Sequence, residues 1–170
     1  MKKLPMLICL LLGGCAGLPE GVQPVQDFTL ERFLGTWYEI ARLDHSFERG
    51  LSKVTAEYSL NDDGTVKVVN KGFSEQKGKW KSAEGKARFV DAEDLGYLKV
   101  SFFGPFYGSY IVVELDKETY QYALISGPNK KYLWLLARSP VMKAAAKTRL
   151  IARAKDLGYA VDSLIYVDHD

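Results

Sequence analysis

The sequence predicts an all-β fold: an eight-stranded antiparallel up-and-down β-barrel with one C-terminal α-helix packed outside it. Three observations predict this fold. From Gly35 onward, apolar and polar residues alternate in short runs that turn residues separate, a pattern typical of half-buried strands joined as a meander. The alternation stops near residue 138, and a single stretch with helical spacing follows. No internal repeat or low-complexity segment interrupts this order. A barrel of eight strands can enclose a small ligand.

Residues 1–14 are expected to be a lipoprotein signal peptide. Lys2 and Lys3 precede an apolar run that is too short to span a bilayer as a helix. The run ends in Leu-Gly-Gly directly before Cys15, which resembles the bacterial lipobox. The resemblance implies that Cys15 is acylated on its sulfur and becomes the first residue after cleavage. The next residue is Ala16 rather than aspartate, which implies the outer membrane, with the domain facing the periplasm. The alternative is an ordinary signal peptide in which Cys15 is incidental.

Residues 15–26 are expected to be the lipidated cysteine and a flexible tether, because the segment contains Pro19, Gly21 and Pro24. The domain at 27–170 is long enough to bury one core. It contains no cysteine, so it folds without a disulfide. Removing two lysines with the signal takes the 23 basic residues to 21, which balances the 21 acidic ones. This balance predicts no nucleic-acid partner.

Eight runs are predicted as strands, and a short apolar run at 164–167 is predicted as a further strand outside the barrel. The eight runs are 35–42, 53–60, 65–73, 78–90, 97–103, 109–116, 120–126 and 132–138. The second and third runs are joined by residues 61–64, Asn-Asp-Asp-Gly, which is a strong hairpin signal.

The fourth run changes phase along its length. Lys79 and Lys81 are at odd positions, whereas Lys86 and Arg88 are at even positions. Because neighbouring side chains on a strand face opposite sides, both pairs can face water only if a β-bulge near 84–85 shifts the pleat. The side chains that such a bulge would leave inside the barrel are Trp80, Ala87 and Phe89.

One helix is predicted after the strands. Ser139 is expected to cap it, Pro140 suits its first turn, and Gly158 suits its end. Its apolar residues recur with helical spacing at Ala146, Leu150, Ala154 and Leu157. The opposite face is basic, which is typical of a solvated face, although contact with anionic lipid headgroups is an alternative.

Specific residues resemble the lipocalin family. Gly35 and Trp37 open the first strand and resemble the family's Gly-x-Trp signature. Arg138 ends the eighth strand, where lipocalins carry an arginine that lies across this tryptophan at the closed end of the barrel. A guanidinium on an indole gains a cation–π contact, and its donors can reach backbone carbonyls. The stretches 35–42 and 100–108 resemble the bacterial lipocalins in particular, and the resemblance extends from the lipobox to Val167. Residues 127–129 match the family's middle motif only in part.

The resemblance implies a cavity that opens at one end and takes up a lipid tail first. A long acyl chain buries several hundred square ångströms, and at about 25 cal/mol/Å² this drives binding strongly. Tyr107 is expected to bind a carboxylate or phosphate head, and the loop at 43–52 is expected to cover the mouth. The residues expected to bind the ligand are Val54, Ala56, Trp80, Phe89, Val100, Phe102, Phe106, Tyr107, Tyr110, Tyr122 and Trp134. The alternative is that these aromatic residues fill a closed core.

The sequence offers little that indicates an enzyme. His45, beside Asp44 and Glu48, is interpreted as a surface loop histidine rather than an acid–base partner. No nucleophile elbow, phosphate-binding loop or metal-ligand cluster is recognised. Glu39 shares the orientation of Trp37, so its carboxylate is expected inside the barrel, paired near the closed end, with a ligand contact as the alternative.

The first functional hypothesis is therefore a membrane-anchored protein that holds or transports a fatty acid or lysophospholipid, in envelope maintenance or stress. Its expected partners are that lipid and the membrane, reached through Cys15, and no metal or cofactor is expected. An envelope enzyme acting on a lipid and a filled-barrel interaction lipoprotein remain as alternatives. A homodimer is left open.

Overall fold

The computed structural model describes residues 17–170, so the predicted signal peptide and the acylation of Cys15 lie outside the described residues. In chain order the elements are α1 (Leu30–Phe33), β1 (Gly35–Arg42), β2 (Leu51–Leu60), β3 (Val66–Ser74), η1 (Glu75–Lys77), β4 (Lys79–Phe89), β5 (Tyr97–Phe103), β6 (Phe106–Leu115), β7 (Tyr122–Ser126), β8 (Leu133–Ala137), α2 (Ala144–Asp156), η2 (Val161–Ser163) and β9 (Ile165–Tyr166).

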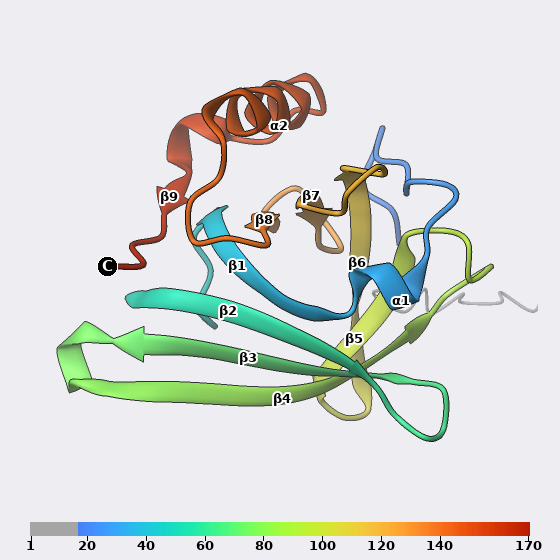
Figure 1. Ribbon diagram of the computed structural model, residues 1–170, viewed down its shortest axis with the longest axis horizontal. Coiled ribbons are helices and arrows are strands. Elements are labelled where there is room, and N and C mark those ends of the chain that lie inside the picture. The colour runs from blue at the N-terminus through green and yellow to red at the C-terminus, as the bar shows by residue number, and fades with distance from the viewer. Residues whose placement is uncertain (1–16) are drawn as a thin grey trace, which may run out of the picture.

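The strands β1 to β8 close into an antiparallel barrel. Each strand pairs with the next along the chain, and β1 pairs with both β2 and β8, which closes the sheet. The helix α2 lies outside the barrel and α1 lies at one end of it (Figure 1). The predicted fold class is confirmed, including the short outer strand: β9 pairs with Ala41 and Arg42 of β1, beyond the point where β2 pairs with that strand.

The helix α2 begins later than the sequence predicts. Ser139 does not cap it. Its hydroxyl instead accepts a hydrogen bond from the backbone N–H of Val141 in a turn, and Met142 is buried before the helix starts. The predicted end is correct, because Gly158 has a φ of +82°, the left-handed conformation that ends helices. Leu150 and Ala154 are fully buried against the outside of the barrel, with residues of β1, β7 and β8.

The predicted bulge in β4 is wrong. The pairing of β3 with β4 runs without interruption from Val66 opposite Ala87 to Ser74 opposite Lys79. Lys79 and Lys81 therefore stay on the inward-facing side of β4, but they lie at its exposed outer end, where the β3–β4 hairpin projects past the other strands (Figure 1). Water reaches the lysines there, so no bulge is needed.

Gly85 has a packing role instead of a bulge. A Cβ atom at this position would lie 2.8 Å from Cδ1 of Phe102 and 2.8 Å from the carbonyl oxygen of Ser101. Glycine therefore leaves the space that the Phe102 ring occupies inside the barrel.

The end of the barrel beside α1 is closed by packing around Trp37. This side chain is fully buried, and its Nε1–H donates a 2.8 Å hydrogen bond to the carbonyl of Phe33 in α1. The Arg138 guanidinium lies 4.0 Å above the Trp37 ring and donates to the carbonyls of Arg32 (2.7 Å) and Thr36 (3.0 Å). The connections β1–β2, β3–β4, β5–β6 and β7–β8 lie at the opposite, open end.

Candidate ligand-binding site

A cavity occupies the open half of the barrel. The empty space within it, including open solvent at its rim, is about 480 Å³. Its apolar wall is formed by Ala56, Val68, Val100, Phe102, Ile125 and Leu136. Its polar lining is formed by Glu39, Glu48, Tyr58, Asn70, Tyr110 and Trp134. A concave, mostly apolar site with a few polar groups is the usual form of a small-molecule site.

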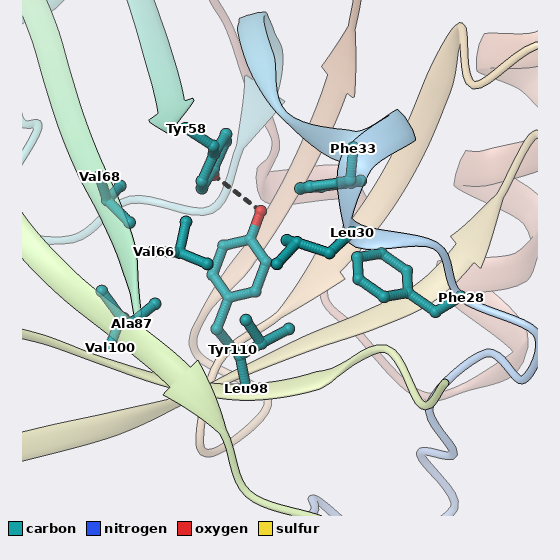
Figure 2. Close-up of a pocket in the computed structure, with 10 residues that line it drawn as sticks. All are labelled: Phe28, Leu30, Phe33, Tyr58, Val66, Val68, Ala87, Leu98, Val100 and Tyr110. Carbon is teal, nitrogen blue, oxygen red and sulfur yellow. Dashed lines mark hydrogen bonds between the residues drawn. The ribbon is translucent and has the colours of Figure 1, made fainter. Parts of the chain in front are cut away.

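Two tyrosines form the floor of this cavity. The hydroxyls of Tyr58 on β2 and Tyr110 on β6 are 2.8 Å apart across the barrel interior. Both residues also line a smaller apolar hollow beneath, where Phe28, Leu30 and Phe33 fill the closed end (Figure 2). Burial raises the pKa of both phenols above its usual value, so both stay protonated and the floor is neutral.

A buried ionic cluster lies at the mouth. Arg42 Nη1 donates a 2.7 Å hydrogen bond to Glu39 Oε1, and Arg42 Nη2 donates a 2.8 Å bond to the carbonyl of Glu48. Glu48 Oε2 accepts a 3.0 Å hydrogen bond from Trp134 Nε1 and lies 2.9 Å from His45 Nε2. The β1–β2 connection thus folds over the cavity and is held there by its own side chains.

The two carboxyl groups of this cluster differ in acidity. Burial raises the pKa of Glu39 well above its ordinary value of 4.5; the nearby Glu48 charge raises it further, and Arg42 only partly opposes this. Burial also acts to raise the pKa of Glu48, but the contacts with His45 and Trp134 outweigh it and leave that pKa below the ordinary value. The cavity wall therefore holds one carboxyl that favours its proton and one that favours its charge.

Five of the residues expected to bind a ligand line this cavity together. They are Ala56, Val100, Phe102, Tyr110 and Trp134. Glu39 also faces the cavity, so it lies inside the barrel as predicted, but it is paired with Arg42 at the mouth rather than near the closed end.

Four other expected ligand-binding residues lie outside the barrel interior. Trp80 is 59% exposed and packs edge-on against Phe73, because the uninterrupted β3–β4 register turns it outward. Phe106 is 78% exposed at the β5–β6 turn. Tyr107 lies on the outer face, beneath the cations of Arg88 and Lys99, and therefore cannot bind a head group in the cavity. The remaining one, Tyr122, packs on the side of α2, since β7 turns its neighbour Ala123 inward.

Two more expected residues, Val54 (buried) and Phe89 (half-buried), do not line the cavity. Phe89 packs edge-on against Phe28 in the closed half of the barrel. Val54 lies beside Gly72, where its Cγ2 would be 3.2 Å from an added Cβ.

Several cavity residues were not among those expected to bind a ligand. Tyr58 and Leu136 are each two residues from a correctly placed residue on the same strand, Ala56 and Trp134, so alternation alone indicates them. Glu48 has no such signal, because it belongs to a loop. The expectation that His45 is a surface residue is wrong. Its side chain is only 6% exposed and lies among the rings of Tyr132 and Trp134.

Within residues 17–170, no three His, Cys, Asp or Glu side chains are arranged to hold a metal ion. In the same part of the chain, no helix has the length and apolar character needed to cross a membrane.

Comparison with known proteins relates the chain to one family. A family model described as a lipocalin-like domain matches residues 28–169. The chain is 57% identical over 168 residues to outer membrane lipoprotein Blc of Vibrio cholerae, covering 98% of each protein. It is 52% identical over 149 residues to the protein of the same name from Escherichia coli, covering 88% of this chain and 84% of that one. It is 35% identical to temperature-induced lipocalin-1 of Arabidopsis thaliana, covering 84% and 80%.

Solved structures share the fold. Insecticyanin from the tobacco hornworm superposes with a TM-score of 0.71 at 24% identity, covering 91% of this chain and 87% of that one. At this level of identity the likeness concerns the fold alone.

Proposed function

This chain belongs to the lipocalin family, and we propose that it holds a fatty acid or a lysophospholipid in its barrel cavity at the outer membrane. Its close relatives are named outer membrane lipoproteins, and it is likewise a lipid-anchored protein of that membrane. We assign the anchor to Cys15 and the periplasm to the side that the domain faces. One observation carries the proposal: the cavity has an apolar wall and lies above a floor formed by Tyr58 and Tyr110.

The tail of the lipid lies along the wall and ends above the hydroxyls of Tyr58 and Tyr110. An acyl chain needs no polar partner there, and burial of its surface drives binding. The head stays at the mouth. Lys79 and Lys81, on the inward-facing side of β4, supply positive charge for a carboxylate or phosphate in place of the role expected of Tyr107.

Quenching of tryptophan fluorescence by a brominated fatty acid tests this proposal. The three tryptophans lie in three places: Trp37 at the closed end, Trp80 outside and Trp134 in the cavity. Bromine on the bound chain should quench Trp134, so Trp134→Phe should lose most of the quenching and Trp80→Phe should retain it. Competition by lysophospholipid should restore the emission. Quenching that disappears in Trp80→Phe would place the lipid outside the barrel and contradict the proposal.

A lipid-directed enzyme is the second candidate, because the cluster at the mouth contains acid–base groups. Glu39 favours its proton, and His45 lies 2.9 Å from Glu48. We favour a binding role, since Arg42, His45 and Trp134 satisfy these carboxyl groups and hold the loop over the cavity. Hydrolysis of an ester lipid by the wild type that His45→Ala abolishes would favour the enzyme instead.

A further inference from the structure

Exposed aromatic rings gather at the open end of the barrel. Phe47 in the β1–β2 connection is 68% exposed, and Phe103 and Phe106 at the β5–β6 turn are 72% and 78% exposed. Trp80, at the start of β4, is exposed as well. Phe47 lies in one connection and the other three lie at strand ends beside two further connections, and the up-and-down topology places all three connections at the same end. Apolar residues grouped in this way mark a surface that contacts a partner or a membrane.

Two cations lie over Tyr107, the residue after Phe106, and a third lies in the β3–β4 connection. The Arg88 guanidinium is 5.0 Å and the Lys99 ammonium 5.6 Å from the centre of the Tyr107 ring, on the outer face next to Phe106. Lys77, in the β3–β4 connection, is exposed. Within residues 17–170, none of these three cations forms an ion pair with a carboxylate. Aromatic rings with neighbouring free cations match the chemistry of an anionic bilayer surface.

The start of the described chain lies on the same side. The carbonyl of Gly17 accepts a 2.9 Å hydrogen bond from the hydroxyl of Ser109 on β6, and Ser109 pairs with Lys99. Along β6, Ser109 is three residues, about 10 Å, from Phe106 at the open end. It is six residues, about 20 Å, from Leu115 at the closed end. Only Ala16 lies between Cys15 and Gly17, so the two residues are at most about 7 Å apart along the chain. Acyl chains on Cys15 therefore enter the bilayer nearer the open end.

We propose that the open end of the barrel docks on the bilayer, with Phe47, Phe103 and Phe106 among the lipid headgroups and the neighbouring cations on anionic lipids. This inference rests on the acylation of Cys15 assigned above. With the mouth against the bilayer, a lipid passes between membrane and cavity without crossing water. Exposure of its tail to water would cost hydrophobic free energy.

A polarity-sensitive dye on single introduced cysteines tests the docking. The chain's own cysteines are Cys9, in the signal peptide, and Cys15, so a label is specific for the introduced residue in the acylated protein. Phe106→Cys reports the open end. Leu60→Cys is the matched control, because Leu60 is also exposed (54%) but lies at the closed end of β2. The acylated variants are reconstituted in vesicles of phosphatidylethanolamine and phosphatidylglycerol.

The emission at position 106 should shift to the blue in vesicles and that at position 60 should not, and removal of phosphatidylglycerol should reduce the shift. A dye at 106 that stays in water, or a shift at 60 instead, would overturn the proposal. A blue shift at 106 that is present before vesicles are added and reverses on dilution would also overturn it, by assigning this surface to a second copy of the chain.

Displacement of a fluorescent fatty acid from the same samples separates this test from the proposed function. If the fatty acid binds while the dye at 106 stays in water, the docking is wrong and the cavity's role stands. If the dye shifts while no fatty acid binds, the docking stands and the cavity's role is wrong.

Discussion

The fold favours the protonated form of the Glu39 carboxyl group. It is 3% exposed, and burial together with the charge of Glu48 raises its pKa well above 4.5. Between 4.5 and that raised pKa, the folded state binds more protons at this site than the unfolded state does, so the free energy of unfolding falls as pH increases. The stabilising contribution of the protonated group is complete below pH 4.5 and is lost as pH rises through the pKa of the folded state.

Glu39→Gln should therefore flatten the decline in stability above about pH 4.5, because glutamine does not ionise. Urea denaturation at a series of pH values measures this slope. Glu48→Gln is the control for the opposite pH range. The pKa of Glu48 is lowered in the folded state, so the stability contributed by its charged form is lost as pH falls below 4.5. Parallel profiles for the wild type and Glu39→Gln above pH 4.5 would show that Glu39 is ionised in the fold.

Arg138 holds the closed end through a small number of contacts. Its guanidinium covers Trp37 and donates to backbone carbonyls of the α1 segment. Hydrogen bonds from a charged donor contribute about 1.5–3 kcal/mol, so Arg138→Ala should lower the free energy of unfolding by roughly 2–3 kcal/mol. Arg149→Ala, which breaks an exposed pair with Glu114, should cost at most about 1 kcal/mol. If thermal or urea unfolding showed that Arg138→Ala and Arg149→Ala lose equal free energy of unfolding, this role of Arg138 would be contradicted.

The sequence correctly predicted which side chains face the barrel interior where inward and outward side chains alternate without interruption, and it failed elsewhere. Val100 and Phe102 on β5 were placed correctly because side chains alternate between the two faces of this strand around the outward-facing Lys99. Trp80 was misplaced because every lysine of β4 was expected to face away from the interior, whereas Lys79 and Lys81 reach water at the barrel mouth. His45 and Glu48 lie in a loop, where no periodicity exists, and only the folded loop brings them to Trp134.

At the scale of elements, the inner faces of β4 and β5 fit each other through one glycine. Gly85→Ala should push the Phe102 ring into the cavity, since the new Cβ would lie 2.8 Å from it. Overpacking of this kind costs about 1–3 kcal/mol and should also weaken binding of an acyl chain. Gly108→Ala on β6 is the matched control, because no atom lies within 4 Å of its added Cβ and its φ is not positive. If both variants bind a fatty acid as the wild type does, Gly85 does not shape the cavity.

Element boundaries were predicted well where turns are strong and poorly where tertiary contacts decide. The sequence predicts β1 and β5 with the bounds that the structure has. The helix α2 was predicted to begin at Ser139 because serine and proline are good first-turn residues, but Ser139 forms a turn, Met142 is buried, and the helix begins only after Lys143. A single sequence does not reveal that competition between a local cap and the core.

On the scale of the whole molecule, the barrel is divided into a filled half and an open half by Tyr58 and Tyr110. This division follows from the paired hydroxyls and from the aromatic residues that pack beneath them. The eight-strand barrel was predictable because each strand carries the same alternation. The depth of its cavity was not, because that depth depends on which inward side chains meet across the interior.

Tyr110→Ala should join the cavity to the hollow beneath it and shift the preferred ligand to a longer acyl chain. The loss of a large ring that packs inside the barrel should also lower the free energy of unfolding by roughly 3–5 kcal/mol. Displacement of a fluorescent fatty acid by chains of increasing length measures the preference. Tyr122→Ala is the control, since it removes an aromatic ring from the side of α2 and should leave the preference unchanged.

The central property proposed for this protein is that its barrel cavity holds a lipid. Native mass spectrometry of the purified protein, followed by organic extraction, tests that claim directly. We expect one fatty acid or lysophospholipid per chain, displaced by added long-chain lipid and lost more readily from Trp134→Ala, whose side chain lines the cavity. An empty protein that also refuses added long-chain lipids would contradict the account and favour a barrel that acts through its outer surface alone.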